Sequence, residues 1–150
     1  MMCKELQRIL LAEDSELDAE LTIEALEASK LANKVDWVKD GVEVMEYLRK
    51  EGQYKGRTSG FPMVILLDIK MPKKSGLEVL KEIREDSALK YIPIVILTSS
   101  KEERDLYEGY ALGVNAYVVK PVNHTAFIDT IRELGLFWAV INETPLNESV

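Results

Sequence analysis

The stretch Met63-Val64-Ile65-Leu66-Leu67-Asp68 decides the fold of this chain. Consecutive apolar residues with no alternating polar side chains are typical of a strand that is covered on both faces, as in a parallel sheet. The run ends at the acidic residue Asp68, and a loop through Met71-Pro72 follows it. The stretch therefore predicts a buried central strand with helices packed above and below the sheet.

Strand-like and helix-like segments alternate on both sides of this strand. Further strands are expected at residues 8–12, 34–38, 94–97 and 116–119. A helix follows each strand, and five residues that can cap a helix mark where these helices begin: Ser15, Asp40, Ser75, Ser100 and Asn123. The alternation predicts an α/β chain with a doubly wound (βα)5, flavodoxin-like fold and a five-stranded parallel sheet in the order 2-1-3-4-5.

Helical spacing also suggests which side chains share a face. Leu17, Leu21 and Ala25 share one face of the first helix, and Val42, Met45 and Leu48 share one face of the second.

Composition limits the classes of function. The chain has 150 residues, a net charge of −7 and one cysteine, Cys3, and it contains no apolar run long enough to span a membrane. We expect a cytoplasmic protein whose main ligand is neither a membrane nor a nucleic acid. We expect one domain over residues 1–135 and a C-terminal extension over 136–150 that is too short for a separate output domain.

Polar side chains stand directly after four of the expected strands. These residues are Glu13 and Asp14, Asp68, Thr98 and Lys120. Because the carboxyl ends of parallel strands lie along one edge of a sheet, these groups are expected to meet in one crevice. Oxygen ligands favour Mg²⁺, with Mn²⁺ as an alternative, and a lysine with a hydroxyl suits a phosphoryl group. The lone His124 and Cys3 cannot form a zinc site, and His124 is given no role.

Four blocks of sequence carry a resemblance to a known family. They are Leu10-Leu11-Ala12-Glu13-Asp14-Ser15; Leu66-Leu67-Asp68-Ile69-Lys70-Met71-Pro72 with Ser75-Gly76; Ile96-Leu97-Thr98-Ser99; and Ala116-Tyr117-Val118-Val119-Lys120-Pro121. Together they resemble the receiver domains of two-component response regulators. The long 52–62 connection and Phe137-Trp138 are similar to the stand-alone cyanobacterial phytochrome response regulators.

The resemblance implies roles for these residues. Asp68 would be the phosphoryl acceptor and also a metal ligand, and Asp14 would bind the metal directly. Glu13, where many members have aspartate, would reach the metal through water, and the backbone carbonyl of Lys70 would complete the metal site. Thr98 and Lys120 would hold the phosphoryl oxygens. Three further features follow from the family pattern: a Thr98–Tyr117 switch pair, a cis Lys120-Pro121 bond, and room for the phospho-donor beside Ser99.

The resulting expectation is a single-domain response regulator, not an enzyme acting on other substrates. A sensor histidine kinase or phosphotransfer protein would donate the phosphoryl group, and the output would be altered protein contacts. A homodimer through the last strand and helix and the C-terminal extension is left open, as is a partner for the 52–62 loop, whose glycines suggest mobility. Alternatives are a phosphate-independent interaction module, an aspartyl phosphatase and a flavin carrier. Lys70 stands where the phosphatase would have a second aspartate, and Glu13-Asp14 would repel a flavin phosphate.

Overall fold

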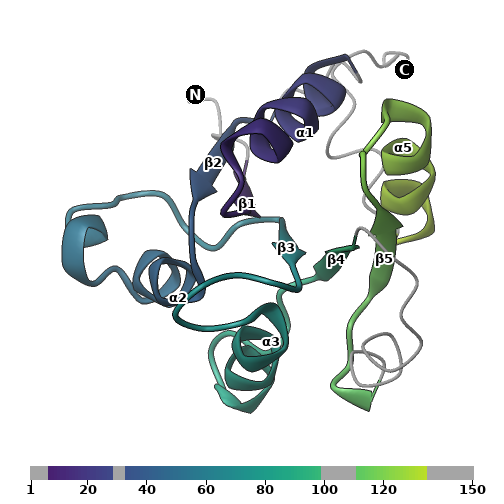
Figure 1. The fold of residues 1–150 in the computed structure, drawn as a ribbon. Helices are drawn as coiled ribbons and strands as arrows, with labels where there is room; N and C mark the ends of the chain where they lie inside the picture. Colours follow the sequence, from purple (N-terminus) through teal and green to yellow (C-terminus); the bar gives the residue numbers. More distant parts are fainter. Residues whose placement is uncertain (1–6, 29–32, 99–110, 135–150) are drawn as a thin grey trace, which may run out of the picture.

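The computed structural model describes residues 7–28, 33–98 and 111–134 (Figure 1). Its parallel sheet has the strand order β2-β1-β3-β4-β5, so the predicted topology is confirmed. The strands are β1 (Ile9–Ala12), β2 (Val35–Val38), β3 (Val64–Asp68), β4 (Ile94–Thr98) and β5 (Ala116–Val119). Each lies within one or two residues of its predicted position. Within the described ranges, no helix is long and apolar enough to cross a membrane.

Helices cover both faces of the sheet. Figure 1 shows α1 and α5 on one face and α2 and α3 on the other. The described helices are α1 (Glu16–Ala28), α2 (Gly41–Arg49), the short 3-10 helix η1 (Gly52–Tyr54), α3 (Gly76–Glu85) and α5 (His124–Glu133). The helix expected to begin at Ser100 lies mostly outside the described residues, as does the 136–150 extension.

Alternating side chains of the sheet build two apolar cores. On β1, Leu10 and Ala12 belong to the core beneath α2 and α3, while Ile9 and Leu11 belong to the core beneath α1 and α5. All four residues are fully buried. This burial on both faces is the reason that the strands read as unbroken apolar runs.

Four of the five predicted helix starts are confirmed by their capping hydrogen bonds. The backbone N–H of Asp18 donates to Ser15 Oγ, and that of Glu43 donates to Asp40 Oδ1. The same bond forms at α5, where Ala126 N donates to Asn123 Oδ1. Ser75 and Glu78 form a complete capping box at α3.

The inward face of α1 differs from the prediction. Leu17 and Leu21 are 64% and 41% exposed, whereas Ala19, Thr22 and Leu26 face the sheet. Leu17 and Leu21 each lie about 200° around the helix from Ala19, because successive residues turn by about 100°. Leu17 and Leu21 are therefore exposed to solvent, and Ala19, Thr22 and Leu26 make the contact with the sheet.

The second helix needs a smaller correction. Val42 is 37% exposed, while Val44, Met45, Tyr47 and Leu48 are buried. Because Asp40 caps α2, Val42 lies in the first turn of the helix. The residues that pack against the sheet come after it.

Arg57 fastens the centre of the 52–62 loop to α2. The Arg57 guanidinium lies 4.0 Å from the centre of the Tyr47 ring. Arg57 Nε and Nη2 donate to the backbone carbonyl of Tyr47 at 3.0 and 2.7 Å, and Nη1 donates to that of Ser59 at 2.8 Å. One side chain thus closes the loop onto α2.

An ion pair joins β1 to β2 beneath this loop. Arg8 donates two hydrogen bonds to Asp36, at 2.7 and 2.9 Å, and the Tyr47 hydroxyl donates a third. Burial alone would raise the pKa of the Asp36 carboxyl, but the bonds from Arg8 and Tyr47 outweigh it and leave the pKa below its usual value. Asp36 is therefore charged in the folded chain at neutral pH.

We expect Asp36→Asn to lower the free energy of unfolding at pH 7 by about 1–3 kcal/mol, since it weakens charge-assisted hydrogen bonds. Because the folded pKa is lowered, this stabilisation is present above the unfolded pKa of Asp36 and is lost as the pH falls through the folded pKa. Urea unfolding at several pH values measures the difference between wild type and variant. Asp129→Asn, an acid-to-amide change on the exposed side of α5, is the control; an equal loss there would contradict the assignment.

Candidate functional site

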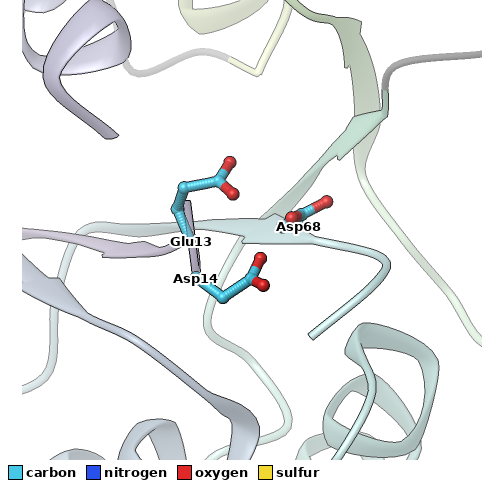
Figure 2. A group of neighbouring side chains, drawn as sticks. All are labelled: Glu13, Asp14 and Asp68. Atoms are coloured by element: carbon cyan, nitrogen blue, oxygen red, sulfur yellow. The ribbon is translucent and has the colours of Figure 1, made fainter. Parts of the chain in front are cut away.

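The acidic residues that the sequence predicted to converge lie together at one edge of the sheet. Asp68 is the last residue of β3, and Glu13 and Asp14 follow β1 directly. Strands β1 and β3 are paired, with Ala12 opposite Leu67, so the next residues on each strand are neighbours. Glu13, Asp14 and Asp68 each offer a carboxylate oxygen within 4.8 Å of the others (Figure 2).

Lys120 reaches this acidic cluster from the end of β5. Its Nζ donates to Glu13 Oε1 at 3.0 Å and lies 3.5 Å from Asp68 Oδ2. It also donates to Asp18 Oδ2, on α1, at 3.2 Å. The backbone N–H of Lys120 donates to the Thr98 carbonyl at 2.8 Å, which fixes the end of β5 against β4. One ammonium group therefore faces three carboxylates.

Burial shapes the charge of the site. Glu13 is fully buried and Asp68 is 6% exposed. Burial raises the pKa of Glu13 to about 7, and the nearby Asp68 adds to this effect, while the hydrogen bond from Lys120 opposes it. Burial would lower the pKa of Lys120, but Glu13, Asp68 and Asp18 leave it above its usual value. Lys120 therefore keeps its charge, and Glu13 sits near its titration point at neutral pH.

Two glycines let the loop after Asp68 pass between α2 and α3. A Cβ at Gly76 would lie 2.3 Å from the backbone oxygen of Asp68, and one at Gly41 would lie 2.1 Å from that of Lys74. Real Cβ atoms do not approach so closely, so both positions need glycine. The backbone N–H of Lys70 points back to Asp68 Oδ1 at 3.4 Å. The role of the Lys70 carbonyl as a metal ligand stays a prediction.

Thr98 lies on β4, the strand paired with β3, and Tyr117 lies on β5, the next strand of the sheet. Thr98 ends β4 and is 7% exposed, and Val119 is its partner on β5. Tyr117 is half-buried and packs against the core beneath α2 and α3. The Lys120-Pro121 bond is cis, as the family pattern predicted. Ser99 lies outside the described residues.

Two contacts of the site were missed in the sequence. The Trp37 indole N–H donates to the Glu13 carbonyl at 2.7 Å and so holds the backbone of the acidic cluster. The second contact is the hydrogen bond from Lys120 Nζ to Asp18 on α1. The place of Asp18 in the first turn of the helix that follows Glu13-Asp14 was the available signal. His124 is exposed at the start of α5.

The donor set fits a hard divalent cation. The three carboxylates come from the ends of two neighbouring strands, and Glu13 and Asp68 are buried while Asp14 is exposed. Carboxylate oxygens are the ligands that Mg²⁺ and Mn²⁺ prefer. Three close carboxylates facing one ammonium leave negative charge that such a cation would offset. Glu13, Asp14 and Asp68 are the residues that could hold it.

Comparison with known proteins places the chain among signalling proteins. The family model of the response regulator receiver domain matches residues 9–132. The response regulator Rcp1 from Synechocystis sp. is 39% identical over 130 residues, which are 87% of this chain and 87% of Rcp1. A solved structure of Mn²⁺-bound Rcp1 has a TM-score of 0.72 at 38% identity, covering 89% of this chain and 94% of that one.

Two further solved structures are phytochrome response regulators. The bacteriophytochrome response regulator RtBRR is 54% identical with a TM-score of 0.84, covering 94% of this chain and 85% of that one. The phosphorylated cyanobacterial phytochrome response regulator RcpA is 41% identical with a TM-score of 0.74, covering 89% and 94%. The similarity to phytochrome response regulators noted in the sequence is thus confirmed.

We expect the affinity of the acidic cluster for Mg²⁺ or Mn²⁺ to fall as the pH is lowered from 8 to 6. Because the pKa of Glu13 is about 7, a proton competes with the cation for this carboxylate below that pH. The loss should approach about tenfold per pH unit on the acid side. Isothermal titration calorimetry at pH 6, 7 and 8 measures it.

Glu13→Gln is the matched variant for this titration, because it keeps His124 and all other acids. It should bind the cation more weakly at pH 8, and its affinity should vary little between pH 6 and 8. A wild-type affinity that is the same at pH 6 and pH 8 would contradict the assignment of Glu13.

Proposed function

The chain belongs to the response regulator receiver domain family, and from this membership we propose that Asp68 accepts a phosphoryl group from a phosphohistidine donor in a reaction supported by Mg²⁺ or Mn²⁺. The phosphorylated chain then signals through altered contacts with other proteins. Its role is signalling, not the turnover of an external substrate.

One observation carries the proposal: Asp68 ends the central strand with the carboxylates of Glu13 and Asp14 within 4.8 Å and the Lys120 ammonium 3.5 Å away. The positive charge of Lys120 is therefore already beside the acceptor carboxylate when the phosphoryl group arrives. Phosphoryl transfer depends mostly on positioning and on charge neutralisation, and both are supplied here by side chains on strand ends.

The transfer itself is a simple exchange of bonds. An Oδ atom of Asp68 attacks the phosphorus and forms an acyl phosphate, while the P–N bond of the donor phosphohistidine breaks and its electron pair returns to the imidazole. Lys120 and the Thr98 hydroxyl bind the transferred oxygens. Glu13, Asp14, Asp68 and the Lys70 carbonyl would hold a divalent cation, which would supply further positive charge beside them.

The response of the fold runs through Thr98 and Tyr117. We infer that the Thr98 hydroxyl turns toward the phosphoryl group and that the Tyr117 ring moves further inward to fill the space. Tyr117 is half-buried, so it has an inward position to gain. The phosphoryl group would stabilise this arrangement at the expense of the other, a shift of population on the face that β5 and α5 share.

The input partner follows from the relatives. Both RtBRR and RcpA are phytochrome response regulators, so we propose a phytochrome-type sensor histidine kinase, or a phosphotransfer protein after it, as the donor for this chain.

The output that we propose is a contact between two copies of the chain through the face of β5 and α5. The exposed Val119 on β5 favours this form of output.

We expect incubation with acetyl phosphate and Mg²⁺ to add the mass of one phosphoryl group, and we expect EDTA or Asp68→Asn to abolish the gain. EDTA removes the divalent cation, and the amide of the variant lacks both the charge and the nucleophilic oxygen of Asp68. Intact-protein mass spectrometry measures the gain, and circular dichroism confirms that the variant is folded.

Asp86→Asn serves as the matched control, because Asp86 lies on the C-terminal side of α3, away from the acidic cluster. It should be phosphorylated like wild type. If folded wild-type protein gained no mass from acetyl phosphate or from a phosphorylated histidine kinase, the phosphate-independent interaction module would be the better description.

A further inference from the structure

We propose that Asp18 is a positioning residue that holds Lys120 in the unphosphorylated chain and competes with the incoming phosphoryl group for the Lys120 ammonium. This inference rests on the proposed phosphorylation of Asp68 and adds a residue to it. Asp18 stands on the first turn of α1, outside the acidic cluster of Glu13, Asp14 and Asp68.

The argument begins with the donors of Lys120. A lysine ammonium has three N–H groups and no acceptor. Its Nζ lies 3.0 Å from Glu13, 3.2 Å from Asp18 and 3.5 Å from Asp68, so three carboxylates already face the three donors. The Lys120 side chain is only 12% exposed, which leaves little space for a fourth partner. A phosphoryl oxygen can be bound only if one of these contacts gives way.

Asp18 is the contact that yields most easily. Glu13 is fully buried, and its second oxygen accepts a hydrogen bond from the backbone N–H of Ser15 at 3.2 Å. Asp68 is the acceptor itself and stays in place. The Asp18 side chain is 39% exposed, so water can solvate its carboxylate once Lys120 leaves.

The Asp18 carboxylate has no other described role that would explain its position. Among the hydrogen bonds and ion pairs of the described residues, its only partner is Lys120, and its backbone N–H is used by the Ser15 cap. Removing the charge therefore weakens the hold on one donor of Lys120 and keeps the Ser15 capping bond at the start of α1. Asp18 thus lowers the availability of Lys120 to any phosphoryl donor.

The test is the rate of phosphorylation of the full chain by acetyl phosphate and Mg²⁺, followed by intact mass. In this reaction the new bond joins an Asp68 Oδ atom to phosphorus, and the bond between phosphorus and the acetyl oxygen breaks, so that acetate leaves with the electron pair. At subsaturating acetyl phosphate, Asp18→Asn should raise the rate about two- to fivefold, the range expected for breaking a half-exposed ion pair.

Three variants separate this role from a general effect. Asp18→Glu keeps the charge and should behave like wild type. Glu20→Gln removes the same charge from α1 about 200° around the helix, and it should leave the rate unchanged. In a Lys120→Ala background, Asp18→Asn should have no further effect, because the two residues act through one contact.

Salt provides a second readout that a purely structural role would not give. The rate advantage of Asp18→Asn should shrink between 0.05 and about 0.5 M NaCl, because salt screens charges at exposed sites. An Asp18→Asn rate equal to or below that of wild type, or an Asp18→Glu variant as fast as Asp18→Asn, would overturn the proposal while leaving phosphorylation of Asp68 intact. Absence of any mass gain in wild type would overturn both.

Discussion

The site depends on the contacts of the Lys120 ammonium with the buried carboxylates of Glu13 and Asp68. Two neighbouring strands end in acids, and two of these carboxylates are buried, an arrangement that like-charge repulsion opposes. The compensating charge comes from β5, which is separated from β3 by β4. Adjacent strands are about 4.8 Å apart, so only a long side chain can cross the end of β4 and reach Asp68. The sheet order and the length of lysine together make the acidic convergence stable.

Much of this arrangement could be predicted because its signals are local. Strands buried on both faces appear in the sequence as unbroken apolar runs. The helix starts are indicated by the residues that cap them: Ser15, Asp40, Ser75 and Asn123. Parallel strands then place the residues that follow them at one edge, which is how Glu13 and Asp68 could be paired across the sequence. Each inference needs only a short window and a general rule of topology.

The remainder depends on how elements rotate and pack. The face of α1 was predicted wrongly because leucines at helical spacing do not reveal which side meets the sheet. Ala19, Thr22 and Leu26 make that contact instead. For the same reason Asp18 could not be assigned to Lys120, since the two residues are 102 positions apart and no local pattern links them. The residues at 99–110 and 135–150 lie outside the described structure, so the predictions made for them stay predictions.

Trp37, on β2, connects the acidic cluster to a hollow on the surface of the protein. Its indole N–H donates to the Glu13 carbonyl, and Trp37 also lines a hollow of about 400 Å³ together with Arg57 and Tyr47. A change in the position of Glu13 would therefore alter the surroundings of an aromatic ring that already faces solvent in part. Once Trp138 is replaced, the emission of the remaining tryptophan becomes an optical readout of events at Asp68 that needs no added label.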